Sequence, residues 1–101
     1  MPTSVELSGE LACIVLTGIF DYSVQDDFQQ TINNVLNNNV VKEIQVDMMD
    51  LVFIDSSGIR LLLLLNQKAV ADGKSVTLIN CHDPVREVFF IGGFDAVFTI
   101  R

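Results

Sequence analysis

The most chemically informative residues of this sequence form one tetrapeptide, Asp55-Ser56-Ser57-Gly58. It precedes an apolar run that predicts a helix over residues 57–72. A carboxylate and two hydroxyls would then lie at the positive end of that helix, where unpaired backbone N–H groups donate to a hydroxyl oxygen and favour a phosphate more strongly. Ser-rich helix caps are common, so the tetrapeptide alone indicates a plain cap more often than a phosphate site.

Other groups that could do chemistry are sparse. His82 beside Asp83 has the residue types of a base and its orienting carboxylate, but a lone His in a turn is more often a loop residue. No Gly-x-Ser-x-Gly elbow surrounds Ser56, which argues against a hydrolase. A nucleotide site near Asp21 and Ser56 would lack a P-loop lysine. The sequence also contains no set of metal ligands, so we expect neither a metal nor a cofactor.

The composition argues against several classes of partner. The 101 residues include 6 basic and 13 acidic side chains, a formal charge of −7, whereas nucleic acids and anionic membranes are bound through clustered Lys and Arg. Half of the residues are apolar, which suits one core and a single domain over residues 1–101. Cys13 and Cys81 have no CxxC or zinc-site spacing, and the N-terminal residues lack the regions of a signal peptide. We therefore expect a cytoplasmic protein with no nucleic-acid binding and no membrane insertion.

The apolar pattern predicts five strands and three helices. Val5 and Leu7 alternate with polar residues and lead through a turn to a continuous apolar run at 11–16, which predicts a hairpin whose second strand is covered on both faces. The other expected elements are a helix at 23–36, a strand at 44–48, a loop at 49–55, a helix at 57–72, a strand at 75–80, a helix capped by Asp83 with Pro84 in its first position, and a strand at 97–100.

This order of elements predicts an α/β fold. Successive βαβ crossovers make a sheet of about five strands mostly parallel after the opening antiparallel pair. The strand at 44–48 has one polar face, which favours three helices mainly on the other face. In the third helix one set of side chains is expected to face inward: Val85, Val88, Phe89 and Ile91.

Two segments together resemble a known family. Gly18-Ile19-Phe20-Asp21 closes the second expected strand, and residues 47–58 contain a strand end, an apolar loop and the Asp-Ser-Ser-Gly motif. This pattern resembles the STAS family, named for sulfate transporters and anti-sigma factor antagonists, over essentially the whole chain, and it implies a STAS-like fold. Met48-Met49 departs from the Leu-Ser or Leu-Ala usual there. The sequence ends at the fifth strand, so a partner contact made by the terminal helix of many members would be missing.

The resemblance implies that Ser56, the first serine of the motif, is a phosphoacceptor, with Asp21, Asp55, Ser57 and Gly58 as its neighbours. In stand-alone members a GHKL-type serine kinase phosphorylates this serine and a PP2C-type phosphatase restores it. The implied function is that of an anti-sigma factor antagonist or partner-switching regulator, not an enzyme, which binds its cognate kinase or anti-sigma factor when Ser56 is unmodified. The alternative is a structural STAS subunit of an ABC-type lipid transport complex, which binds its ATPase and needs no phosphorylation.

The expected helix after the motif is apolar on nearly every side, because leucines fill positions 61–65. Five consecutive positions span more than one helical turn, so at least one of them points away from the sheet. Helical spacing toward position 70 points one set inward: Ile59, Leu62 and Leu63. The candidates for an outward, partner-binding face are Leu61, Leu64 and Leu65. From the sequence alone, burial between neighbouring helices and a partner-binding face are about equally supported.

Overall fold

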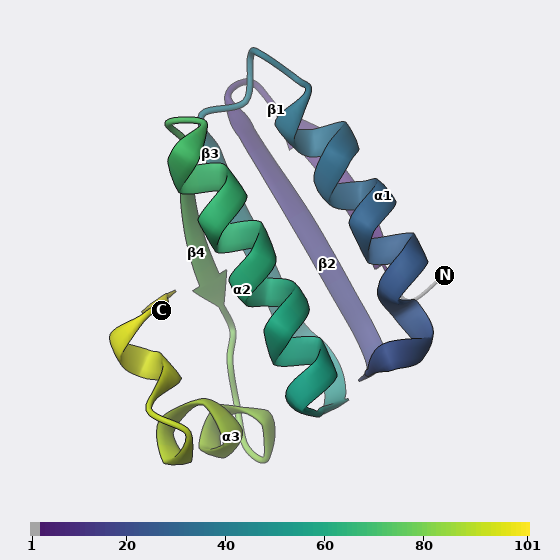
Figure 1. Ribbon diagram of the computed structural model, residues 1–101, viewed down its shortest axis with the longest axis vertical. Coiled ribbons are helices and arrows are strands. Elements are labelled where there is room, and N and C mark those ends of the chain that lie inside the picture. Colours follow the sequence, from purple (N-terminus) through teal and green to yellow (C-terminus); the bar gives the residue numbers. More distant parts are fainter. Residues whose placement is uncertain (1–2) are drawn as a thin grey trace.

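The computed structural model describes residues 3–101, which form a five-stranded sheet with three α-helices (Figure 1). The strands are β1 (Thr3–Ser8), β2 (Leu11–Phe20), β3 (Glu43–Ile54), β4 (Ser75–Ile79) and β5 (Thr99–Ile100). The helices are α1 (Gln25–Leu36), α2 (Ser56–Ala71) and α3 (Val85–Ile91), with short 3-10 helices η1 (Tyr22–Val24) and η2 (Phe94–Ala96). None of the helices in residues 3–101 has the length and apolar character needed to cross a membrane.

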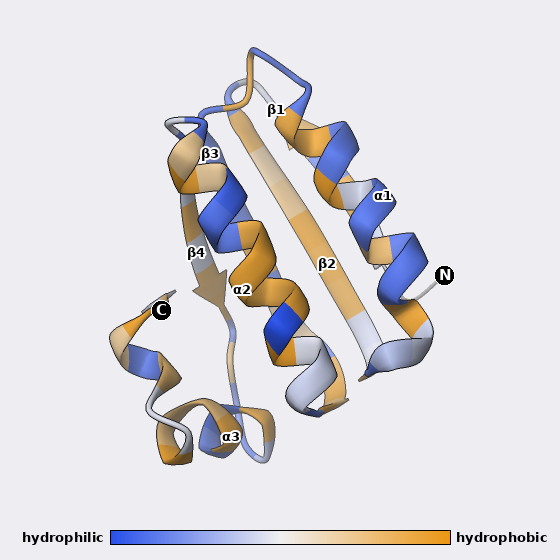
Figure 2. Ribbon diagram, viewed as in Figure 1, coloured by the Kyte–Doolittle hydropathy of each residue, from blue (hydrophilic) through white to orange (hydrophobic). Residues whose placement is uncertain are grey.

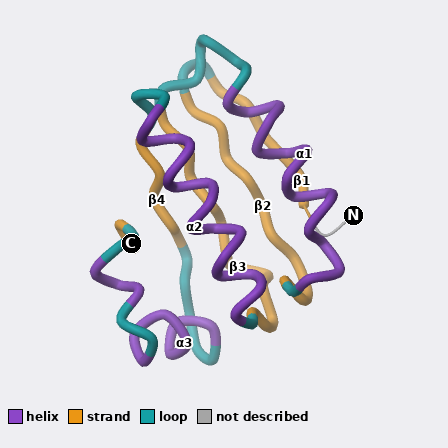
Figure 3. The backbone as a smooth tube through the Cα atoms, in the orientation of Figure 1, coloured by secondary structure: helices purple, strands orange, loops and turns teal. Residues whose placement is uncertain are grey.

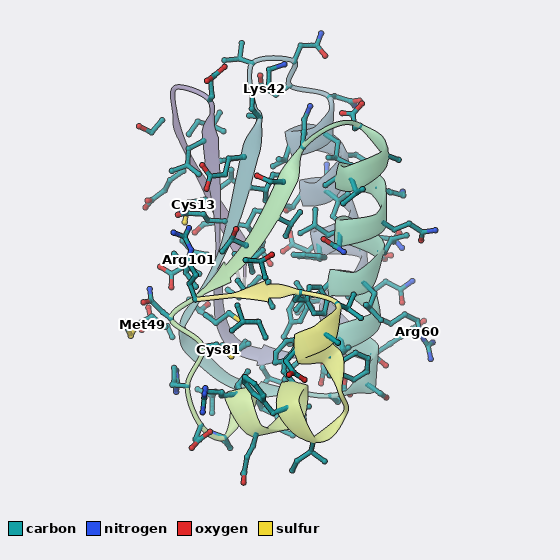
Figure 4. The ribbon with its side chains drawn as sticks, turned by 90° about the vertical axis from the view of Figure 1, so that its left-hand side faces the viewer. Cys13, Lys42, Met49, Arg60, Cys81 and Arg101 are labelled. Atoms are coloured by element: carbon teal, nitrogen blue, oxygen red, sulfur yellow. The ribbon has the colours of Figure 1, made fainter. Side chains whose placement is uncertain are left out.

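The strands lie in the sheet in chain order, β1-β2-β3-β4-β5. β1 and β2 are antiparallel and joined by a turn at Gly9, whose φ is +60°, and all other pairs are parallel. α1 and α2 pack side by side across one face, and α3 lies beyond the carboxyl ends of β3 and β4 (Figures 1 and 4). The predicted α/β class, with a mostly parallel sheet and three helices mainly on one face, is confirmed.

The other face of the sheet is covered by no helix of residues 3–101 (Figure 4). On β2, the side chains of Ala12, Ile14 and Leu16 are buried beneath the helices. The alternating positions point to the other face and are only half-buried: Leu11, Cys13 and Val15. The prediction that this strand is covered on both faces was wrong, because side chains of the adjacent strands, such as Glu6 and Gln45 beside Cys13, are all that shields the outer face.

The core lies between the sheet and the helices and includes two aromatic pairs. Phe20 at the end of β2 meets Phe28 of α1 edge-on, with ring centroids 4.9 Å apart, and Phe89 of α3 meets Phe98 in the same way at 5.7 Å. Such pairs contribute about 0.5–1.5 kcal/mol beyond the burial of their area. Figure 2 shows polar and apolar residues alternating along α1, whereas apolar residues dominate the middle of α2. The first pattern fits a helix that covers the sheet with a single stripe.

β3 is longer than predicted. Residues 49–54, expected as a loop, continue the strand to Ile54 and pair with β2 (Figure 3). The pairing passes through two register shifts, one between Val15 and Thr17 and one between Gly18 and Ile19, and Gly18 has a φ of +72°. A bulge changes the face that the following side chains reach. The apolar residues at 51–54 therefore lose the alternation by which a strand is recognised in sequence.

The last helix begins later than predicted. α3 starts at Val85, and no side chain caps it, so Asp83 is not the cap and Pro84 precedes the helix. The turn before the helix has a cis peptide bond at Asp83-Pro84. It is closed by the carbonyl oxygen of His82, which accepts from the backbone N–H of Arg86 at 2.7 Å. Because this turn holds the chain ahead of the helix, Val85 is the first helical residue.

The last strand is also shorter than the predicted 97–100. The backbone N–H of Phe98 donates to the carbonyl oxygen of Phe94 at 3.1 Å, in a turn that follows η2. This turn keeps residues 97 and 98 out of the strand, although the ring of Phe98 is buried in the core.

By contrast, α2 agrees with the predicted helix within one residue and ends before Gly73, whose φ is +75°.

Candidate functional site

The Asp-Ser-Ser-Gly motif lies at the carboxyl edge of the sheet, where β3 passes into α2 (Figure 1). Phe20, the last residue of β2, is the register partner of Ile54, the last residue of β3. Asp21 and Asp55 each follow these partners directly, so adjacent strands deliver both carboxylates to the same edge. The fold thus gathers at one edge the five residues predicted for the site: Asp21, Asp55, Ser56, Ser57 and Gly58.

Both carboxylates are engaged in holding the backbone. Asp55 Oδ1 accepts from the backbone N–H of Gly58 at 3.0 Å and caps α2. Asp21 Oδ1 accepts from the hydroxyl of Ser23 at 2.6 Å and from its backbone N–H at 2.9 Å, and it begins η1. These two hydrogen bonds, the hydroxyl one first, lower the pKa of Asp21. Both carboxylates therefore serve as hydrogen-bond acceptors that start helices.

The two serines of the motif differ in exposure. Ser56 is the first residue of α2 and is exposed, whereas Ser57 is half-buried. Within residues 3–101 the hydroxyl of Ser56 forms no hydrogen bond, because the capping is done by Asp55. An exposed hydroxyl that forms no hydrogen bond within the described residues can be modified without loss of such a bond.

Gly58 allows α2 to lie directly against the end of β2. A Cβ atom at this position would lie 2.3 Å from the carbonyl oxygen of Phe20 and 2.8 Å from side-chain atoms of Phe20 and Ile54. No real Cβ makes such a contact with backbone, so every other residue would push the helix away. The glycine of the motif is therefore a packing requirement that sets the position of Ser56.

Two grooves flank the first two turns of α2. The larger, about 680 Å³, runs between α2 and α3 and is lined by Ser56, Ile59, Arg60, Leu63, Pro84, Glu87, Val88, Ile91, Gly92 and Phe94. The smaller, about 270 Å³, lies between α1 and α2 and is lined by Tyr22, Gln25, Gln29, Ser57, Arg60, Leu61 and Leu64. The two serines thus open onto different grooves, and Arg60 borders both.

A comparison with sequence models of protein families identifies the family of this chain. The sequence model of the family described as "Mlab, STAS domain" matches residues 3–100. The chain belongs to the STAS family. A STAS-domain containing protein of Pseudomonas aeruginosa (strain UCBPP-PA14) is 29% identical to this STAS domain over 92 residues, which cover 91% of this chain and 89% of that protein.

Solved structures share the fold of this STAS domain. The Bacillus anti-sigma factor antagonist SpoIIAA in its unphosphorylated form has a TM-score of 0.75 at 24% identity, covering 98% of this chain and 86% of that one. An anti-sigma factor antagonist from Mycobacterium paratuberculosis has a TM-score of 0.85 at 18% identity, covering 97% of this chain and 82% of that one. At these identities the likeness establishes the common fold.

The predicted outward face of α2 was wrong for two of its three leucines. Leu61 is 6% exposed and Leu65 is fully buried, and only Leu64 is partly exposed. Helix α2 packs against both the sheet and α1, so two sides of it are covered rather than one. Leu63, predicted to face inward, is also partly exposed and lines the groove between α2 and α3.

The contribution of α3 to the site was not predicted from the apolar pattern. Val88 and Ile91, predicted to face inward, are 36% and 81% exposed, and they line the larger groove. Helix α3 is only seven residues long and lies beyond the end of the sheet, so one narrow side of it, with Val85 and Phe89, reaches the core. Arg60 was not predicted as a residue of the site either. Its one signal in the sequence is that it is a single basic residue just before the leucines that follow the motif.

His82 links the turn before α3 to β3. Its Nδ1 lies 3.0 Å from the carbonyl oxygen of Asp83 and its Nε2 lies 2.8 Å from the carbonyl oxygen of Met49. Two carbonyl acceptors suit the imidazolium, in which both ring nitrogens carry a proton. These contacts, that with Asp83 first, raise the pKa of His82. The ring bonds backbone oxygens rather than the Asp83 carboxylate, so it has the geometry of a structural link.

Replacing Gly58 by alanine is expected to destabilise the protein by about 1–3 kcal/mol, because the new methyl group meets the backbone at Phe20. At an ordinary helix position the same change stabilises by about 0.5–1 kcal/mol. Urea unfolding of Gly58→Ala measures the effect. The matched control compares Gln67→Gly with Gln67→Ala on the exposed side of α2, where alanine should be the more stable. Alanine favoured at both positions would contradict the packing role of Gly58.

His82 is expected to titrate above the usual value of about 6.5 for histidine. A raised pKa in the folded state means that its stabilising contribution is present below about pH 6.5 and is lost as the pH rises through the folded-state pKa. Proton NMR titration gives the pKa directly. The difference in unfolding free energy between wild type and His82→Ala should be larger at about pH 5.5 than at about pH 8. The same difference at both pH values would mean that the imidazolium is not the stabilising form.

Proposed function

We propose that this STAS domain is an anti-sigma factor antagonist or related partner-switching regulator, controlled by reversible phosphorylation of Ser56. It binds a cognate GHKL-type serine kinase or anti-sigma factor in the cytoplasm when Ser56 is unmodified, and a PP2C-type phosphatase restores that state. It acts by binding and not as an enzyme. The observation that carries the proposal is the exposed hydroxyl of Ser56, which lines an apolar groove and forms no hydrogen bond in the described part of the chain.

The switch in this proposal needs no refolding. A phosphate adds about −1.5 to −2 charges, and the amino-terminal end of α2 favours an anion by about 0.3–1 kcal/mol. Unphosphorylated and phosphorylated SpoIIAA match this chain with the same TM-score, 0.75, which supports a fold that accommodates both states. A partner with carboxylates at the interface would be repelled, and a loss of about 2.7 kcal/mol in the complex is a hundredfold in affinity.

The alternative is a structural subunit that binds the ATPase of an ABC-type lipid transport complex. The observation that favours it is the largely apolar lining of the groove between α2 and α3, since permanent interfaces are more apolar than transient ones. This alternative uses the same surface but needs no change of charge at Ser56. The two functions therefore differ in whether modification of Ser56 alters binding.

Ser56 is expected to be the residue modified by the cognate kinase, and its charge is expected to control binding. Ser56→Ala should remain folded and bind the partner, because the native hydroxyl forms no hydrogen bond within residues 3–101. Ser56→Asp should weaken binding at least about tenfold, or about 1.4 kcal/mol. Phosphopeptide mapping and titration calorimetry measure the two effects. A modified Ser57 beside unmodified Ser56 would contradict the assignment, and equal affinities of the two variants would favour the structural subunit.

Leu64 is expected to contact the partner, because it is the one predicted partner-face leucine with an exposed part. Leu64→Glu should keep the melting temperature within a few degrees and weaken binding about tenfold. Two controls on the same helix frame the result: Leu65→Glu should unfold the domain by burying a charge, and Val70→Glu, at a site 63% exposed, should change neither property. Normal binding by a folded Leu64→Glu would place the partner elsewhere.

A further inference from the structure

Arg60 lies one helical turn after Ser56 and borders the same groove. Residues four apart on a helix are surface neighbours, with Cβ atoms about 5–6 Å apart. Both residues are exposed, and Figure 4 shows Arg60 extending from α2 away from the sheet. The guanidinium can therefore reach the space beside the Ser56 hydroxyl without any movement of the backbone.

The Arg60 guanidinium has no partner among residues 3–101. The ion pairs there join Lys74 to Asp72 at 3.0 Å and Arg101 to Glu43 at 3.9 Å. Of the residues that line the groove between α2 and α3, Arg60 is the single basic one and Glu87 the single acidic one, and these two form no ion pair. Arg60 is thus a free cation next to the proposed phosphorylation site.

Other basic residues are less suited to this position. Arg86 on α3 lies over the ring of Phe90, with its guanidinium carbon 4.6 Å from the ring centroid. Lys74 is buried and paired with Asp72, and Lys68 lies in the last turn of α2, far along the helix from Ser56. Arg60 is the cation that the fold holds one turn from the motif.

We propose that Arg60 binds the phosphate of phosphorylated Ser56 as an intramolecular ion pair. This inference rests on the proposed function, because it requires a phosphate on Ser56. An anion that precedes a cation by four residues is the favourable order on a helix, and a guanidinium can bind two phosphate oxygens at once. In the unmodified protein Arg60 is free to pair with a carboxylate of a partner. The phosphate then takes Arg60 from that partner while it also repels the carboxylate, so release has two causes.

The test uses the full chain with phosphoserine installed at position 56 during translation, so that no kinase is needed. Phosphorus NMR follows the second ionisation of the phosphate, which has a pKa of about 6 in ordinary phosphoserine. A nearby cation favours the doubly charged form. The pKa in Arg60→Gln should therefore be higher than in the wild-type chain by about half a unit or more. Arg60→Lys should lie in between, because it keeps the charge but not the two-pronged geometry.

Arg86→Gln is the matched control, since it removes one positive charge from an exposed position outside the groove lining, and it should leave the phosphate pKa unchanged. Amide NMR spectra establish that each variant is folded. The same pKa in wild type and Arg60→Gln would overturn the ion pair, and so would equal shifts in Arg60→Gln and Arg86→Gln. Failure of the cognate kinase to modify Ser56 would instead refute the proposed function and leave this measurement intact.

Discussion

The first turn of α2 lies against the last residue of β2, and the rest of the site depends on this contact. At Gly58 a side chain would come within 2.3 Å of the Phe20 carbonyl oxygen, so helix and strand can meet this closely only through a glycine. The contact fixes the height and rotation of α2 at the sheet edge. Ser56 and Leu62 lie on this same helix, so its placement against β2 leaves Ser56 exposed and buries Leu62.

The electrostatics of the site follow from the use of its carboxylates as caps. Asp21 and Asp55 each accept hydrogen bonds from backbone N–H groups and start a helix. Two acidic residues therefore lie at the same sheet edge as Ser56 even before modification, in a chain whose net charge is −7. Against this background a single free cation such as Arg60 has an effect that it would lack on a basic surface.

The groove beside Ser56 is a product of the carboxyl-terminal part of the chain. The edge-to-face contact of Phe89 with Phe98 and the burial of Val85 hold one side of α3 on the core. The opposite side, with Val88 and Ile91, stays uncovered and forms one wall of the groove, and α2 forms the other. An apolar surface at the edge of the sheet thus arises where a short helix has more apolar residues than the core can take.

Local pattern in the sequence determined the order of elements, the bounds of α2 within one residue, and the place of the motif between β3 and α2, because helical period, caps and turns act over a few residues. Tertiary structure decided the rest. The strand character of residues 49–54 depends on bulged pairing with β2, and the burial of Leu61 and Leu65 depends on α1 as well as on the sheet. The need for Gly58 depends on the distant Phe20, and within residues 3–101 the fold places no acidic side chain in an ion pair with Arg60. A single sequence carries period and local chemistry, whereas contacts between distant segments exist only once the chain has folded.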